Sequence, residues 1–269
     1  MALNIWHYLT DKFRIRCAPE PKKQIYLPLF FFNGCFILPI SIPVDHAWRG
    51  KGNCLNCSLR SQALFSGLIE EDFKQLHQPI DQMVMQPGDV LYRKNDTGRF
   101  LFTVRSGLIK LVKYLPDGRQ RIVRLVCSAE VMGMELLAEE SYRHEAIALQ
   151  QTELCRYPVD EIDRLSLHNP VLHRALMEEW EKMLSEAEAW LTQLSTGPAK
   201  RRMASLLLRL TDDITSECYL FSREDIGSIL SITTETASRT ISEFKRQGLI
   251  KALGHNHYYV DTVALKAIP

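Results

Sequence analysis

Two cysteines stand in C-x-x-C spacing in the stretch CLNCSLRSQALF, Cys54 to Phe65, and no third cysteine follows within it. Thiolates at this spacing bind zinc or iron, or form a redox disulfide. A structural zinc site needs two further ligands at close spacing, and only Cys155 is available as a distant contributor. A thiol oxidoreductase places such a pair after a strand and at the start of a helix in a βαβ unit, and that context is missing. A metal site, a redox pair and two ordinary thiols all stay open.

A second group of reactive side chains lies near the C-terminus, where Glu235, Ser238 and Arg239 fall at i, i+3 and i+4. On a helix they project together from one face. Arginine can donate two hydrogen bonds to guanine, glutamate can accept from cytosine N4, and serine can serve several base edges. Thr234, directly before them, completes the candidate set. A glutamate four residues before an arginine is also an ordinary exposed ion pair, so the DNA interpretation depends on the surrounding elements.

The segment FSREDIGSILSITTETASRTISEFKRQGLI contains the capping and turn residues of a helix-turn-helix. Ser222 can cap the first helix, with Asp225 as a capping-box variant, and SIT makes the turn. Thr233 can cap the second helix and Gly248 can end it. The second helix has an inner apolar face formed by Ala237, Ile241 and Phe244. A short hairpin around ALGHNHYYV follows, which predicts a winged helix-turn-helix.

Upstream, the chain from Met83 to Pro158 has short apolar runs separated by turn signals, which predicts an antiparallel β-rich unit. The clearest hairpin joins Leu108–Tyr114 to Arg121–Val126 through Pro116-Asp117-Gly118.

After Pro170 the apolar period becomes helical and ends at Gly197-Pro198. Steps of four and three predict an a/d seam for a partner helix and hence a symmetric dimer. The alternative is that Trp180 and Trp190 only cover the β unit. The seam consists of Leu176, Trp180, Met183, Ala187, Trp190 and Leu194.

Charge gives little guidance, because the 269 residues include 33 Lys or Arg and 32 Asp or Glu. From Ala199 to Pro269 there are ten basic and eight acidic residues, so phosphate contacts must be few and local. We find no nucleophile elbow, H-E-x-x-H or Walker loop, and expect no enzyme. The available cations are Lys200, Arg201, Arg202, Arg223, Lys245, Arg246 and Lys251.

The seven cysteines form an odd, scattered set in a chain too long to need disulfide staples, which favours a reduced, cytoplasmic protein. Cys127 and Cys218 sit in apolar runs and are expected in the core. The charge-free run from Ile25 to Val44 is almost long enough to span a bilayer, but three prolines and an Asn-Gly pair interrupt it. We therefore expect no membrane partner, while a membrane-anchored sensor remains an alternative.

The β unit, the long helix and the segment TTETASRTISEFKRQGLI together resemble the bacterial CRP/FNR transcription regulators over about residues 50 to 269. The family's recognition helix carries E-x-x-S-R, which Glu235, Ser238 and Arg239 match. The resemblance is closer to the oxygen-sensing FNR branch, through VRSGLIK and TELCRYPVDEIDRL. The cyclic-AMP pattern is broken, because Gly133-Met134-Glu135-Leu136 has an extra residue and Arg143-His144-Glu145 replaces the Arg-Ser pair. No cyclic-AMP site is therefore expected.

FNR proteins hold an oxygen-labile [4Fe-4S] cluster, and the resemblance implies Cys54, Cys57 and Cys155 as three of its four ligands. The remaining ligand position is occupied by Ala63, which cannot bind iron. An iron–sulfur cluster, a dithiol or other metal site, and inert thiols thus remain alternatives. Possible substitute ligands are Cys17, Cys35, Asp45 and His46.

We predict an α+β fold with four parts: an extension (1–49), a sensory β-roll of cyclic-nucleotide-binding type (50–160), a dimerisation helix (161–196) and a winged helix-turn-helix (197–269). The resemblance implies a homodimeric transcription regulator, allosterically controlled by a redox, oxygen or related signal. It would bind palindromic double-stranded DNA with TTGAT-like half-sites about 34 Å apart. The Asp117-Gly118 turn would touch RNA polymerase. A thiol-redox protein built on the C-x-x-C pair is a further alternative.

Overall fold

The computed structural model describes residues 48–52, 54, 56–61 and 64–268. The charge-free run 25–44, and the predicted extension up to residue 47, lie outside these residues. Within the described part, no helix is both long and apolar enough to cross a membrane.

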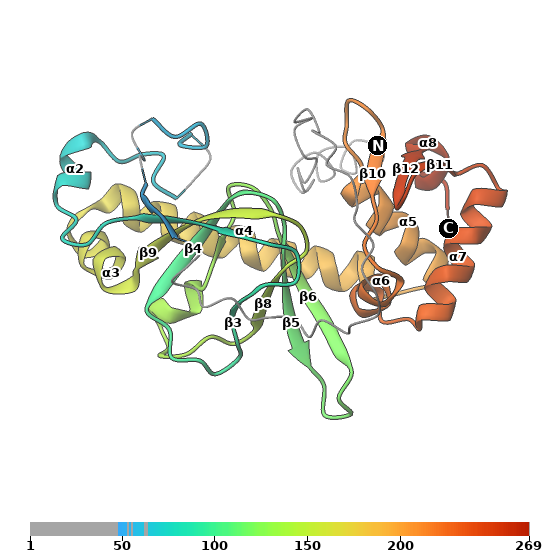
Figure 1. Cartoon of the computed structure of the whole chain (residues 1–269), viewed down its shortest axis with the longest axis horizontal. Helices are drawn as coiled ribbons and strands as arrows, with labels where there is room; N and C mark the ends of the chain where they lie inside the picture. Colours follow the sequence, from blue (N-terminus) through green and yellow to red (C-terminus); the bar gives the residue numbers. More distant parts are fainter. Residues whose placement is uncertain (1–47, 53, 55, 62–63, 269) are drawn as a thin grey trace, which may run out of the picture.

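Two antiparallel sheets form a β-roll (Figure 1). The five-stranded sheet has the order β1-β2-β9-β4-β7, and the four-stranded sheet has the order β3-β8-β5-β6. The β-rich unit predicted from Met83 to Pro158 is confirmed, as is the hairpin of β5 and β6. The strands are β1 (Trp48–Lys51), β2 (Asp81–Met85), β3 (Val90–Tyr92), β4 (Phe100–Ser106), β5 (Ile109–Tyr114), β6 (Gln120–Val126), β7 (Val131–Met132), β8 (Glu145–Ala148) and β9 (Thr152–Pro158).

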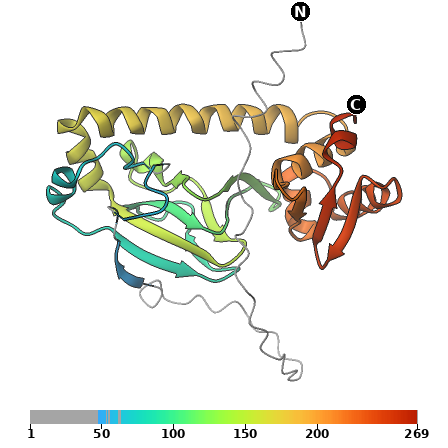
Figure 2. The same ribbon diagram turned by 90° about the horizontal axis from the view of Figure 1, so that it is seen from above.

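Among the described elements, two short helices lie within the roll, and two further helices connect it to the C-terminal unit. The short α2 (Glu70–Lys74) and the 3-10 helix η2 (Met134–Leu137) belong to the roll, and α3 (Val159–His168) follows β9. The long α4 (Pro170–Leu194) begins at a cap formed by Asn169, whose side-chain oxygen accepts from two backbone N–H groups of the first turn. Figure 2 shows α4 running along one side of the roll toward the C-terminal unit.

The predicted seam of α4 is wrong in part. Leu176, Trp190 and Leu194 are only 4%, 7% and 0% exposed, because they pack inside their own chain. Trp180 and Met183 also pack against the core of the roll. The stated alternative holds for Trp180, which covers the roll, whereas Trp190 lies in the cluster that also includes the C-terminal unit. Any partner helix must use side chains of α4 that the chain leaves exposed.

The C-terminal unit is a helix-turn-helix beside a three-stranded sheet of order β10-β12-β11. The predicted helices and the hairpin are confirmed. Its elements are α5 (Ala199–Leu210), β10 (Glu217–Tyr219), α6 (Arg223–Leu230), α7 (Thr234–Arg246), β11 (Ile250–Gly254), β12 (His257–Val260) and α8 (Thr262–Lys266).

Two hydrophobic clusters hold the molecule together, and the second crosses between the units. The first fills the roll, with Leu101, Val104 and Leu154 fully buried. The second joins side chains of the β5–β6 hairpin, including Val112 and Ile122, to the core of the helix-turn-helix. The predicted boundaries 50–160, 161–196 and 197–269 thus stay a prediction, because burial does not follow them.

Candidate nucleic-acid interface and signal site

The second helix of the helix-turn-helix, α7, begins and ends where its sequence predicts. The Thr233 hydroxyl oxygen accepts from the Thr236 N–H at 3.2 Å and caps the N-terminus. At the other end Gly248 has φ of 75°, its N–H donates to the Lys245 carbonyl, and the Leu249 N–H donates to the Phe244 carbonyl. This is a Schellman motif, which favours glycine because of the positive φ.

The first helix, α6, is capped by Ser222, whose hydroxyl accepts from the Asp225 N–H at 3.0 Å and donates to the Asp225 carboxylate at 2.8 Å. The turn between the helices is tight. A Cβ at Gly227 would lie 2.7 Å from the Ile232 carbonyl oxygen, which real Cβ atoms do not tolerate. The two helices are therefore held closely against each other at this turn.

The amphipathic pattern of α7 places the candidate reading residues on its outer face. Ala237, Ile241 and Phe244 are buried against α6 and α5. Thr234, Glu235, Ser238 and Arg239 are all exposed.

The pKa of Glu235 lies below its usual value, because its own backbone N–H and the Thr233 hydroxyl donate to the carboxylate. This carboxylate is charged at neutral pH and can accept from a base.

Several of the predicted phosphate-binding cations are engaged within the protein. Lys200 pairs with Glu243 at 2.5 Å, and Arg202 donates to the Leu230 carbonyl. These two residues anchor α5 to the helix-turn-helix, which sequence reasoning missed because both contacts join distant positions. Arg201, Arg246 and Lys251 are exposed and stay candidates for phosphate contacts.

The structure brings the three candidate cysteines into one neighbourhood. Cys155 lies on β9 and is 7% exposed, while Cys54 and Cys57 are half-buried in the segment between β1 and α2. Burial raises the pKa of Cys54 to about 11, and the neighbouring Cys57 thiol adds to this shift. Burial raises the pKa of Cys155 to about 12, and both other thiols add to the effect. Arg105 opposes both shifts.

These residues do not fit a four-thiolate cluster as the structure describes them. They supply three thiols, and the remaining predicted position, Ala63, lies outside the described residues. Among the residues that are described, no group of three or more His, Cys, Asp or Glu side chains is placed to hold a metal ion. Turns rather than a helix follow Cys57, so a thioredoxin-like context is also missing there.

Cys127 and Cys218 are buried, as predicted.

The segment after the C-x-x-C pair is fastened to the start of α4. Phe65 packs edge-on against Tyr157 of β9, with ring centroids 4.8 Å apart. The amide of Asn169, the cap of α4, donates to Asp72 of α2 at 2.8 Å. The cysteine segment and the long helix are therefore joined through one short element.

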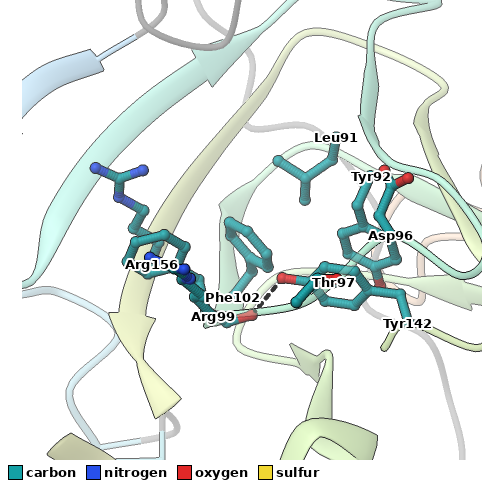
Figure 3. Close-up of a pocket in the computed structure, with 9 residues that line it drawn as sticks. Leu91, Tyr92, Asp96, Thr97, Arg99, Phe102, Tyr142 and Arg156 are labelled. Carbon is teal, nitrogen blue, oxygen red and sulfur yellow. Dashed lines mark hydrogen bonds between the residues drawn. The ribbon is translucent and has the colours of Figure 1, made fainter. Parts of the chain in front are cut away.

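A cavity of about 260 Å³ opens among β3, β4 and β9 (Figure 3). The rings of Tyr92 and Tyr142 stack in its wall with centroids 3.7 Å apart, and the Tyr142 hydroxyl donates to the Phe100 carbonyl at 2.8 Å. Arg156 lies at its edge and pairs with Asp81 at 3.0 Å. The residues that line it come from the roll and not from α4.

Between the roll and α4 lies a network of charges that, apart from Lys182, are poorly exposed. Arg124 of β6 is 3.5 Å from both Glu130 and Glu186, and Lys182 is 3.9 Å from Glu130. Arg209 of α5 is 8% exposed and faces the same carboxylates. The network therefore contacts three structural units: the roll, α4 and the C-terminal unit.

The residues of the broken cyclic-AMP pattern form hydrogen bonds with one another and with neighbouring side chains. The Glu135 carboxylate accepts from the Arg143 N–H at 3.2 Å, and the Arg143 guanidinium turns outward to Glu139. Burial lowers the pKa of His144, which favours its neutral form. Arg143 and Glu135, the charged residues of this pattern, therefore make contacts within the protein.

Two family models match the chain in this order. A cyclic nucleotide-binding domain matches residues 82–169, and a Crp-like helix-turn-helix domain matches residues 201–268. A sensory roll followed by a helix-turn-helix defines a class of signal-controlled DNA-binding regulators.

Curated relatives narrow the class. The chain is 28% identical to the transcriptional activator protein anr of Pseudomonas aeruginosa and 27% identical to the transcriptional activator protein FnrA of Stutzerimonas stutzeri. Each match covers 81% of this chain and 93% of the relative. The structure of FixK2 from Bradyrhizobium japonicum shares the fold, with a TM-score of 0.65 and 23% identity over 70% of this chain and 96% of that one.

The chain belongs to the CRP/FNR family of transcription regulators, on its FNR-like branch. It is a DNA-binding transcription regulator of that type, and the predicted α+β fold is confirmed. The helix-turn-helix domain and the relatives imply DNA binding and dimer formation. The relatives are regulators and not enzymes.

The charge network predicts a pH dependence of stability. Burial, followed by Glu130, raises the pKa of Glu186 from 4.5 to about 7 despite the Arg124 contact. Between these pH values the folded protein holds a proton that the unfolded chain has released, so stability falls as pH rises and levels off above about 7. We expect the loss of unfolding free energy between pH 5 and pH 8 to be about 2 kcal/mol smaller in Glu186→Gln than in the unsubstituted protein.

Urea unfolding at pH 5 and pH 8 checks this prediction. The matched control is Glu188→Gln, which removes an exposed carboxylate from the same helix. If both variants show the same change between the two pH values as the unsubstituted protein, Glu186 does not carry the effect.

Proposed function

We propose that α7 reads a palindromic DNA site with TTGAT-like half-sites through Thr234, Glu235, Ser238 and Arg239. The observation that carries this proposal is their common exposure on one face of a helix whose other face is fixed to α6. The N-terminal half of such a helix meets base edges in the major groove. Arg239 can bind guanine with two hydrogen bonds, and Glu235 can accept from cytosine.

Arg239→Ala should weaken binding by about 1–3 kcal/mol, concentrated on one base pair of the half-site. The measurement is affinity for a panel of palindromes that carry single symmetric substitutions. Arg246→Ala is the control, because it removes an exposed arginine from the end of the same helix. It should weaken all sites alike. Uniform weakening by Arg239→Ala would show that this residue contacts only the backbone.

For the dimer, we propose an α4 face that keeps Trp180 and Ala187 of the predicted seam and replaces its other members by exposed neighbours. Met177, Leu184 and Leu191 recur every seven residues and are 50%, 63% and 63% exposed in the single chain. With Trp180 and Ala187 between them, the steps are again three and four. A stripe of this period fits a parallel or antiparallel helix partner and buries apolar surface that water now covers.

Leu184→Glu should convert the dimer to a monomer, since a charge at the centre of the stripe cannot be buried without a partner. Sedimentation velocity measures the outcome. The control is Leu167→Glu, at a leucine of α3 that is 74% exposed and outside the stripe. A dimer that survives Leu184→Glu would contradict the proposed face.

We propose further that Cys54, Cys57 and Cys155 receive a redox or oxygen signal, in a cytoplasmic protein that does not bind cyclic AMP. The proposal is supported by the shared neighbourhood of the three thiols and by the link through Asp72 to Asn169 at the start of α4. Oxidation of two of these thiols to a disulfide would transfer two electrons and two protons to an oxidant such as O2, which becomes H2O2, and would shift this segment. Because burial raises the pKa of Cys54 and Cys155, a thiol must first lose its proton to react.

Anaerobic purification followed by air exposure tests the signal. We expect no broad visible absorption, and about a tenfold difference in DNA affinity between reduced and oxidised protein. Cys155→Ser should abolish the difference, whereas Cys218→Ser, at a buried thiol of the C-terminal unit, should keep it. A visible absorption that bleaches in air, with matching iron and sulfide, would show instead that a further ligand completes a cluster.

The exposed Asp117-Gly118 turn of the β5–β6 hairpin is our candidate for a contact with RNA polymerase. Asp117→Ala should lower transcription in a purified system and leave DNA affinity unchanged. Unchanged transcription would remove this assignment.

A further inference from the structure

The hairpin of β5 and β6 belongs to the roll by hydrogen bonding but packs into the C-terminal unit. Val112 and Ile122 are fully buried, and they share one hydrophobic cluster with Ile226 and Ile229 of α6. Apolar packing of this kind resists sliding, because protein interiors fill space closely. The sensory roll therefore touches the helix-turn-helix directly, in addition to its connection through α4.

One ion pair spans this contact. Lys110 of β5 lies 2.5 Å from the Asp225 carboxylate in the first turn of α6. The two side chains are only 13% and 15% exposed, and Asp225 also accepts from Ser222. Removing one partner of such a pair leaves the other charge poorly solvated, so the pair favours one relative placement of the two elements.

Arg121 of β6 makes a second contact of the same kind. Its guanidinium donates to the Ser228 carbonyl of α6 at 3.3 Å and to the hydroxyl of Ser195 at 2.8 Å. Ser195 is the C-cap residue of α4. The planar arginine thus ties the end of the long helix to α6 through two different guanidinium nitrogens, and a lysine has only one donor atom in their place.

The placement of α6 decides the placement of α7. The two helices share a core, and the Ile232 N–H donates to the Gly227 carbonyl at 3.1 Å across the turn between them. Asp225 and Ser228 lie one turn apart on α6, so the two hairpin contacts fix both its position and its rotation. A shift of the hairpin would carry the reading residues with it.

We propose that Lys110 and Arg121 are positioning residues that set the orientation of α7 relative to α4. In a symmetric dimer this orientation fixes the distance between the two reading helices, and hence the spacing of the half-sites that the protein prefers. This inference rests on the proposed DNA reading by α7. It assigns the spacing preference to side chains of the sensory roll that need not touch DNA.

The test uses the full-length dimer and palindromes whose half-sites are separated by the preferred spacer or by one base pair more or fewer. We expect Lys110→Met to lower affinity for the preferred spacer about tenfold and to flatten the preference. Asp225→Asn should do the same, and the double variant should be no worse than either single variant, because all three lack the same pair. Lys113→Met, at an exposed lysine of the same strand, should leave the preference intact.

Additive effects in the double variant, or an unchanged spacer preference in both single variants, would overturn the inference. Arg121→Lys gives an independent measurement that keeps the charge and should also flatten the preference. An unsubstituted protein that binds no palindrome would instead contradict the proposed function. Sedimentation and thermal unfolding confirm that each variant is a folded dimer before its affinity is compared.

Discussion

The structure depends on a single helix, α4, that has apolar side chains on more than one side. Leu176, Trp190 and Leu194 are buried in their own chain, whereas Leu184 and Leu191 face water. Burial of a large apolar side chain contributes about 1.5–3 kcal/mol, but an exposed i,i+4 pair such as Arg174–Glu178 on the same helix contributes about 0.3–0.5 kcal/mol. Hydrophobic burial therefore determines how α4 packs, and the proposed dimer face is the side that one chain leaves uncovered.

Charged groups where the roll meets other elements determine orientation more than stability. The network around Arg124 and the pair Lys110–Asp225 both lie where the roll meets other elements. The side chains of Lys110, Asp225, Arg124, Glu130 and Glu186 are each 15% exposed or less. Poorly solvated pairs add little net stability, since the loss of hydration offsets the attraction. They penalise any other arrangement strongly, however. Apolar packing brings the units together, and these pairs select one orientation.

Local signals predicted most of the fold and both ends of α7. Thr233 and Gly248 mark the ends of α7 because caps and positive φ are decided within a few residues. The prediction of the seam was wrong in part because α4 has two apolar faces with steps of three and four, and both include Trp180 and Ala187. Periodicity alone does not show which of the two faces is buried within the same chain. Contacts such as Lys110–Asp225 join positions far apart in sequence and leave no local signal. The gathering of the cysteines was implied only by the family resemblance.

Two mechanical routes connect the cysteine segment with the reading helix, and they meet at one place. The first runs from Asp72 through Asn169 along α4 to Ser195. The second runs through the sheets of the roll to the β5–β6 hairpin and reaches Ser195 through Arg121. A displacement of α4 alone would strain the arginine contacts, and a displacement of the hairpin alone would strain its packing on α6. In the proposed regulator, a displacement of the cysteine segment would therefore act on the helix-turn-helix through both contacts at Ser195.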